Sequence, residues 1–423
     1  MKNILIIGSG LTGCLTAYKA AKLFPKKKIY LLDSSNKILN GFKSEKFGHL
    51  KVNNGYHGID IERNQDFFNF LKKKIKVPFI KVKDERYVIF GESFFKDGLS
   101  LKEYPKEIFH KFKFKSYKNE SLLNIYKKLP NSYRINIKNI SKRYSNNFKD
   151  NLRFFIPWFL PKEFELISKD EGDIFRKNVR KNKIKSYIGY PKNFLFENFS
   201  KKFTKELNNL KNIDFILNTK FNLNEKKISF TKKDQKIEIN YKYLFICTNT
   251  PFFLKRVVTL LKKNLMNKKI FTLSLIKTKK LDLKFTEILI ANKTNLNFMR
   301  LSKINPKNRN YFLLESIFDN KKLIENKLSQ EKLNKLFNII DKKKKLNPKN
   351  IMTKITRTIY FPSDIFIKNL RQTTKSEFAK LKKNNKEKSI HGIFNFSPIN
   401  MSKSWIESEK NIGNLKKAVN RNE

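Results

Sequence analysis

A glycine-rich turn near the N-terminus constrains the fold more than any other feature of the sequence. The turn, Gly8-Ser9-Gly10-Leu11-Thr12-Gly13, follows four consecutive large apolar residues at 4–7, a pattern typical of a parallel strand buried on both faces. After it, the apolar spacing predicts a helix over 11–23 and a second strand over 28–32, which leads into Asp33. Strand, glycine turn, helix, strand and acidic residue in this order predict a dinucleotide-binding βαβ unit.

Each glycine of the turn has a physical role in such a unit. Gly8 allows the tight turn, Gly10 lets the backbone approach a pyrophosphate, and Gly13 lets the helix pack closely on the strand. Asp33 lies 20 residues after Gly13, where its carboxylate can bind ribose hydroxyls and would repel a 2′-phosphate, so FAD or NAD is expected rather than NADP. A glycine-rich turn without a ligand is the alternative. The predicted cofactor-binding residues are Gly8, Ser9, Gly10, Leu11, Thr12, Gly13, Asp33 and Ser34.

The pattern along the rest of the chain indicates a discontinuous domain. Helices are expected over 193–210 and 402–419, and strands over 213–217, 227–230, 236–239, 243–247 and 390–396. With 423 residues the chain is too long for one small core. We expect an α/β fold in which 1–75, 186–255 and 385–423 form a Rossmann-like domain. An inserted substrate or cap domain of mixed sheet and helices would occupy 76–185 and 256–384.

The charge of the chain narrows the range of partners. The sequence carries 93 Lys and Arg against 37 Asp and Glu, a net charge of +56, but 80 of the basic residues are lysines and only six residues are alanines. Lysine has AT-rich codons and alanine GC-rich ones, so base composition explains most of the excess, and no specific nucleic-acid partner is expected. A polyanion or an anionic membrane surface, bound peripherally, is the alternative.

The scarcity of cysteine and histidine excludes other classes of protein. Cys14 and Cys247 cannot form a disulfide framework for a chain of this size. The four histidines show no metal-ligand spacing, so no metal site is expected. The longest apolar run, at 154–160, is too short to span a bilayer. A cytoplasmic protein without a transmembrane segment is therefore expected.

Several segments outside the βαβ unit carry a resemblance to one family of proteins. They are Leu39-Asn40-Gly41-Phe42, the loop Asn54-Gly55-Tyr56-His57-Gly58-Ile59-Asp60, the run Tyr190-Pro191-Lys192-Asn193-Phe194, the strand 213–219, and Asn400-Met401-Ser402 at the start of the last helix. Together they resemble the FAD-dependent superfamily of amine oxidases, protoporphyrinogen oxidase, phytoene desaturases and UDP-galactopyranose mutase. Phe42 stands where this family has the second of two glycines.

The resemblance implies that the Rossmann-like domain binds FAD, and it adds residues to the cofactor site. Gly41, Tyr56, His57, Asn400 and Met401 would lie beside the cofactor. His57 would face the isoalloxazine ring and bias its redox state through a hydrogen bond or a positive charge. A polar turn residue between two glycines is the alternative for His57.

Two arginine segments resemble the mutase branch of the family. Arg176-Lys177-Asn178-Val179-Arg180 is similar to a segment whose arginine implies contact with a diphosphate, and Phe298-Met299-Arg300 is similar to a later arginine strand. Arg180 and Arg300 are therefore predicted to hold the substrate in the catalytic site. The alternative for both is an arginine paired with a nearby acid. Because the chain has only 13 arginines, each carries more information than a lysine.

The resemblance implies an enzyme and leaves two reactions open. The favoured one is that of a flavin-dependent oxidoreductase of amine oxidase or protoporphyrinogen oxidase type, in which a small-molecule substrate passes hydride to N5 of the flavin. The second is a UDP-galactopyranose mutase-like isomerisation, in which reduced flavin attacks the anomeric carbon of a nucleotide sugar without net redox change. A basic, non-catalytic protein that binds polyanions is a third hypothesis.

Overall fold

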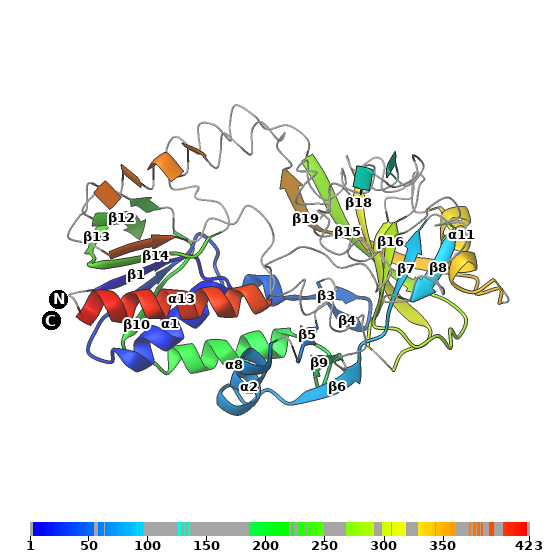
Figure 1. Ribbon diagram of the computed structural model, residues 1–423, viewed down its shortest axis with the longest axis horizontal. Coiled ribbons are helices and arrows are strands. Elements are labelled where there is room, and N and C mark those ends of the chain that lie inside the picture. Colours follow the sequence, from blue (N-terminus) through cyan, green and yellow to red (C-terminus); the bar gives the residue numbers. More distant parts are fainter. Residues whose placement is uncertain are drawn as a thin grey trace.

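The computed structural model describes the chain over 3–54, 58–62, 64–90, 92–96, 186–219, 221–223, 227–232, 235–248, 268–291, 298–305, 307–318, 329–342, 344–360, 389–392 and 401–420, and in short pieces between 126 and 135 and between 372 and 383. These residues form a mixed α/β structure with several sheets (Figure 1). None of the helices in this part of the chain has the length and apolar character that a bilayer crossing requires.

A five-stranded parallel sheet is the centre of what we call the Rossmann-like half. Its strand order is β10 (Ile213–Ile216), β2 (Ile29–Leu32), β1 (Ile4–Ile7), β14 (Tyr243–Ile246) and β20 (Ser389–Gly392). All four neighbouring pairs are parallel, and β1 lies in the middle. The sheet thus joins strands from the start, the middle and the end of the chain in the order of a doubly wound nucleotide-binding fold.

Two layers cover the five-stranded sheet. One consists of α1 (Leu11–Leu23), α8 (Glu197–Asn208) and α13 (Met401–Asn420), and the other is a small antiparallel sheet of β11 (Phe221–Leu223), β12 (Lys227–Lys232) and β13 (Gln235–Asn240). Ile4 and Ile6 of β1 pack with the helices, whereas Leu5 and Ile7 pack with the small sheet. The continuous apolar run of β1 is therefore explained by burial on both faces.

Aromatic side chains hold the helical layer together. The short helix α2 (Gln65–Asn69) and the π-helical turn η2 (Phe70–Lys74) add Phe67 and Phe70, whose ring centroids lie 5.6 and 5.3 Å from that of Trp405 in α13. The ammonium of Lys19 in α1 lies 3.4 Å from the same indole ring and contacts Glu409 at 2.5 Å. α1 and α13 therefore run side by side, as Figure 1 shows.

Most of the predicted elements of this half are confirmed within a few residues. The predicted helices over 11–23 and 402–419 correspond to α1 and α13. The helix predicted over 193–210 is shorter, because α8 begins only at Glu197, after Phe194 has taken up a left-handed backbone with a φ of +62°. Of the strand predicted over 390–396, residues 393–396 lie outside the described residues. The limits of the two domains stay a prediction.

A seven-stranded mixed sheet forms the second half. Its order is β19 (Lys349–Tyr360), β15 (Lys268–Lys277), β18 (Tyr311–Phe318), β17 (Phe298–Lys303), β16 (Glu287–Ala291), β7 (Arg86–Phe90) and β8 (Ser93–Lys96). Helix α11 (Gln330–Ile340) packs on one face through Leu333, Leu336 and Phe337. On the other face lies a hairpin of β3 (Ser44–Phe47) and β4 (Leu50–Asn53), which belongs to the N-terminal part of the chain (Figure 1).

A three-stranded antiparallel sheet lies between the two halves. It consists of β5 (Ile59–Asp60), β9 (Tyr187–Pro191) and β6 (Phe79–Lys83). Only Asp84 and Glu85 separate β6 from β7 of the seven-stranded sheet. The backbone N–H of Asp84 donates to the carbonyl of Ser186 at 3.0 Å, and the N–H of Thr286 donates to that of Glu85 at 2.7 Å. We call this crossing point the junction.

Candidate cofactor-binding site

The turn after β1 needs glycine at two positions for reasons of packing. Gly8 has a φ of +104°, and a Cβ atom there would lie 2.7 Å from the carbonyl oxygen of Cys247. A Cβ at Gly13 would lie 1.8 Å from the carbonyl oxygen of Gly8. Both distances are far below van der Waals contact, so the strand, the turn and α1 can approach this closely only without side chains.

Gly10 differs from the other two glycines because no atom lies within 4 Å of the Cβ it lacks. The residue is exposed and forms the N-cap of α1, which has no side-chain cap and no acidic residue in its first turn. The first N–H groups of a helix have no partner inside the helix and create a positive potential. An open, uncapped helix start beside a bare backbone fits the pyrophosphate of a dinucleotide.

Asp33 lies at the same end of the sheet as the turn. One carboxylate oxygen, Oδ2, accepts hydrogen bonds from the backbone N–H of Ser9 at 2.5 Å and from its hydroxyl at 2.9 Å, while Oδ1 accepts the N–H of Ser35 at 2.8 Å. A carboxylate has room for about four such bonds, and the Ser9 hydroxyl can rotate. The Asp33 carboxylate can therefore still accept a hydrogen bond from a ribose hydroxyl. The next residue, Ser34, is exposed.

The segment 39–42 folds back onto the turn. The N–H of Leu39 donates to the carbonyl of Ser9 at 2.9 Å, and Leu39 has a φ of +55°. Gly41 is exposed, with nothing within 4 Å of its missing Cβ. Phe42 is buried, and its ring centroid lies 5.2 Å from that of Phe199 in α8. The phenylalanine that replaces a family glycine thus fills the core beneath the site and does not obstruct it.

The two cysteines lie behind the turn. Cys14 Sγ donates to the carbonyl of Ser9 at 3.2 Å, and the amide Nδ2 of Asn411 lies 3.5 Å from Cys247 Sγ. Burial raises the pKa of the Cys247 thiol to about 12. A thiol that stays protonated is a poor nucleophile, so the structure gives both thiols a structural role behind the turn.

Asn53, the residue before the loop that the family resemblance places near the flavin, is hydrogen-bonded to the segment that leads into α8. Its side-chain Nδ2 donates to the carbonyl of Phe194 at 2.7 Å, and its Oδ1 accepts the N–H of Phe196 at 2.9 Å. The loop itself starts at Asn54, and Tyr56 and His57 lie outside the described residues, as do Arg176, Arg180 and Asn400. Met401 is described as the first residue of α13. The roles of these residues stay predictions.

Arg300 is described, and its guanidinium is paired with two acids. Its Nε and Nη2 donate to the two carboxylate oxygens of Glu315 at 3.1 and 2.8 Å, and its Nη1 donates to Glu287 at 3.2 Å. This is the pairing that was the alternative for Arg300. A substrate contact by Arg300 remains a prediction.

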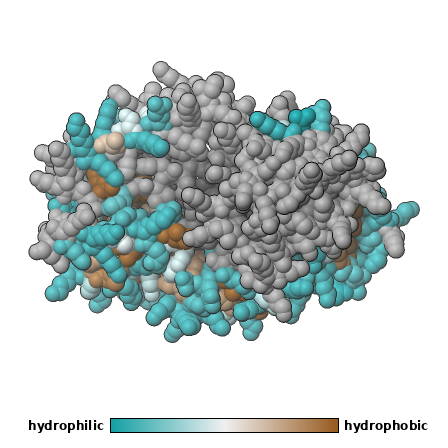
Figure 2. All heavy atoms as spheres, viewed as in Figure 1, coloured by the Kyte–Doolittle hydropathy of each residue, from teal (hydrophilic) through white to brown (hydrophobic). Residues whose placement is uncertain are grey.

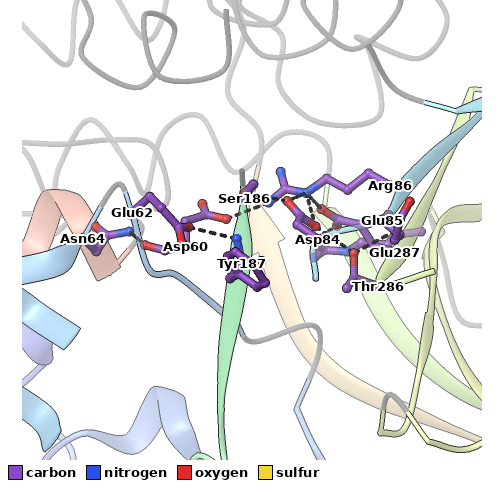
Figure 3. Close-up of polar contacts among 11 residues, drawn as sticks. Asp60, Glu62, Asn64, Asp84, Glu85, Arg86, Ser186, Tyr187, Thr286 and Glu287 are labelled. Atoms are coloured by element: carbon purple, nitrogen blue, oxygen red, sulfur yellow. Dashed lines mark hydrogen bonds and ion pairs between the residues drawn. The ribbon is translucent and has the colours of Figure 1, made fainter. Parts of the chain in front are cut away.

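The junction holds another arginine, Arg86, to which no sequence motif assigned a role. Figure 3 shows it among carboxylates from both sides. Its guanidinium lies 2.7 Å from both Asp60 and Asp84 and 3.4 Å from Glu287. Asp84 also accepts the hydroxyl of Thr286 at 2.8 Å. The scarcity of arginine in the sequence could have drawn attention to Arg86. Nothing in the sequence around its acidic partners indicates that they pair with it.

Glu287 connects the two arginines. It is 4% exposed and contacts Arg86 and Arg300. Burial raises the pKa of Glu287, and the positive charges of Arg86 and Arg300 oppose that shift. If either arginine were lost, less positive charge would offset the free-energy cost of burying the ionised Glu287 carboxylate.

Comparison with known proteins gives matches among solved structures. No family model and no curated protein matches the sequence. A protein from Exiguobacterium sp. 255-15 assigned as a protoporphyrinogen oxidase matches with a TM-score of 0.59 at 12% identity, with 98% of each chain covered. Reduced UDP-galactopyranose mutase gives 0.58 at 13% identity and covers 99% of this chain and 95% of that one. A putrescine oxidase variant gives 0.51 at 7% identity, covering 98% and 99%.

These matches extend over nearly the whole chain, and at such identities they concern the fold. They include both branches that the sequence motifs resembled, an oxidase branch and the mutase. The expected resemblance is therefore confirmed at the level of the fold: the chain has the fold that these solved structures share.

Proposed function

We propose that the chain is an FAD-dependent enzyme, with an oxidoreductase of the amine oxidase or protoporphyrinogen oxidase type as the favoured function. The observation that carries the proposal is the turn after β1. Packing demands glycine at Gly8 and Gly13, while Gly10 is bare and open at an uncapped helix start. A turn with only a structural role would not need the third glycine. The fold of the similar structures supports the same class of cofactor.

The residues of the chain would bind and orient the cofactor. The first N–H groups of α1 would hold the pyrophosphate and Asp33 a ribose hydroxyl, with Gly41 leaving the surface open beside them. FAD, when bound, supplies the acceptor for a hydride from the substrate. Under this proposal the seven-stranded sheet belongs to the substrate side. A cytoplasmic location stays a prediction.

The cofactor assignment predicts a yellow protein with the absorbance spectrum of oxidised flavin. Gly10→Val should abolish flavin binding, because a branched side chain would occupy the space that the pyrophosphate needs. The variant should stay folded, since no atom lies within 4 Å of the added Cβ. Flavin content after gel filtration, together with a thermal unfolding curve, measures both effects. Near-normal flavin content would mean that the loop is only a turn, and a folded, colourless protein that takes up NAD would contradict the choice of FAD.

The mutase-like reaction is kept as a second candidate because UDP-galactopyranose mutase is among the similar structures. It makes a distinct prediction for Arg180. If Arg180 binds a diphosphate, Arg180→Ala should weaken UDP binding by roughly 10- to 100-fold. Arg180→Lys should restore only part of the lost affinity for UDP, because an ammonium group cannot make the planar two-point contact. Flavin content should not change. Titration of UDP, followed by flavin fluorescence, measures the effect.

The matched control for this titration is Arg309→Ala. Arg309 is exposed and pairs with the exposed Asp282, so its loss changes the net charge equally without touching the proposed site. Equal weakening in both variants would indicate a general charge effect. If the wild-type protein does not respond to UDP, the mutase-like reaction is excluded and the oxidoreductase proposal is unaffected.

A further inference from the structure

Three loops at one end of the seven-stranded sheet form a single surface, which we call the basic rim. The rim consists of the described residues within 277–284, 305–310 and 341–350. The N–H of Thr278 donates to the carbonyl of Asn310 at 2.8 Å, and the N–H of Lys279 donates to the carbonyl of Leu346 at 2.9 Å. These two backbone hydrogen bonds join all three loops.

The rim is more basic than the composition of the chain explains. Its 22 described residues include ten basic and two acidic ones, a net charge of +8, where the chain average of +56 over 423 residues would give about +3. The exposed acid, Asp282, lies 2.9 Å from Lys344 and 3.2 Å from Arg309, and these cations hold its pKa below the usual range. The described basic side chains of the rim are exposed: Lys277, Lys279, Lys280, Lys284, Lys307, Arg309, Lys342, Lys344, Lys345 and Lys349. Figure 2 shows hydrophilic side chains along the outer edge of this half of the molecule.

Exposed apolar side chains continue from the rim along β19. Ile351, Met352 and Ile355 are 50%, 41% and 46% exposed, and they are three of the five large apolar residues that stand exposed in the described part of the chain. Among the strands of the described residues, β19 is at the edge of its sheet, and its pairing with β15 is irregular at Ile351. An exposed apolar edge strand in a protein with a large core marks a contact surface.

We propose that the basic rim and the exposed side chains of β19 form a docking surface for an anionic lipid bilayer. Lysine ammonium groups attract acidic headgroups, and aliphatic side chains beside them can enter the interface between headgroups and acyl chains. A nucleic-acid surface is less well matched, because it would use aromatic rings for stacking and arginine for phosphates and bases. The rim has one arginine among its ten described basic residues and no aromatic residue. This inference goes beyond the proposed flavin function and does not depend on it.

The electrostatic part is tested by co-sedimentation with vesicles of phosphatidylcholine and phosphatidylglycerol in equal parts. Wild-type protein should bind these vesicles and not vesicles of phosphatidylcholine alone. Lys345→Glu/Lys349→Glu should weaken binding about tenfold or more. The matched control is Lys26→Glu/Lys72→Glu, which changes the net charge equally at exposed lysines of the Rossmann-like half. Equal losses in the two variants would show that only total charge matters and would overturn the proposal.

The apolar part is tested by Ile351→Ser/Ile355→Ser, which leaves the charge unchanged. Vesicle binding should fall about tenfold, whereas Leu23→Ser should have no effect, because Leu23 is equally exposed (45%) but lies at the end of α1. Wild-type-like vesicle binding by the isoleucine variant would overturn the proposal. So would a change from dimer to monomer in that variant without loss of vesicle binding, because the edge would then be covered by a second copy. Flavin content is the separate readout for the cofactor site.

Discussion

Gly13→Ala should leave a protein that neither folds stably nor retains flavin. The added Cβ would lie 1.8 Å from the carbonyl oxygen of Gly8. That carbonyl cannot move away easily, because the N–H of Gly8 donates to Leu32 at 2.7 Å and the N–H of Cys247 donates to Ile7 at 2.7 Å. We expect a loss of about 3 kcal/mol in the free energy of unfolding, at the upper end of what overpacking causes. Urea unfolding and flavin content measure the two effects.

The matched control is Gly413→Ala, the same change in another helix. Gly413 lies within α13 and has nothing within 4 Å of its missing Cβ. Alanine is the better helix former, so this variant should be more stable than the wild type by up to about 1 kcal/mol. If Gly13→Ala behaved like Gly413→Ala, α1 could not approach the turn as closely as described. Gly13→Ala also differs from Gly10→Val, which should lose flavin without loss of stability.

Arg86→Ala should have an effect of similar size at the junction. The variant would leave Asp84 and Glu287, whose side chains are each only 5% exposed, without a cation that now contacts both. Removing one partner of a buried ionic cluster typically costs about 3–5 kcal/mol. Arg86→Lys should recover part of this, because an ammonium cannot contact three carboxylates in the same geometry. The control is Arg309→Ala, which removes one partner of an exposed ion pair. Its free energy of unfolding should stay close to that of the wild type.

The pH dependence of Arg86→Ala provides a further check. Burial already raises the pKa of Glu287, and loss of the Arg86 charge should raise it more. A carboxyl group whose pKa is higher in the folded state favours folding while it is protonated and loses that contribution as the pH rises through the folded-state pKa. The deficit of the variant should therefore shrink as the pH is lowered, and Arg86→Ala/Glu287→Gln should be more stable than Arg86→Ala at neutral pH. A deficit that is independent of pH and unchanged by Glu287→Gln would contradict this account.

The sequence predicts those parts of the structure that are determined by residues close to one another along the chain. The run at 4–7, the glycines at Gly8 and Gly13, and the helix α1 lie within twenty residues of one another, so their spacing alone defines the βαβ unit. The C-terminal helix was predictable for the same reason. Asp33 is further away, but its distance from the turn is set by one helix and one strand of ordinary length.

The junction could not be predicted in this way. Arg86 contacts Asp60, 26 residues before it, and Glu287, about 200 residues after it. Nothing in the residues next to Arg86 specifies those partners. Glu287 meets Arg86 because β7 pairs with β16 in the seven-stranded sheet, whereas Asp60 comes from β5 of the three-stranded sheet. The hairpin of β3 and β4 was missed because its alternation is short. Its turn depends on a left-handed Gly48 with a φ of +59°.

The packing of α13 on α1 has a consequence for how the protein is made. α1 follows the first strand of the chain, but Asn411, Ile412 and Leu415, which cover it and the turn behind it, belong to the last helix described. A ribosome therefore synthesises the 377 residues between α1 and α13 before the apolar side of α1 can be covered by its native partner. Until then that side stays accessible to chaperones and to other nascent chains. Such a delay favours late, concerted folding of the Rossmann-like half over stepwise folding during translation.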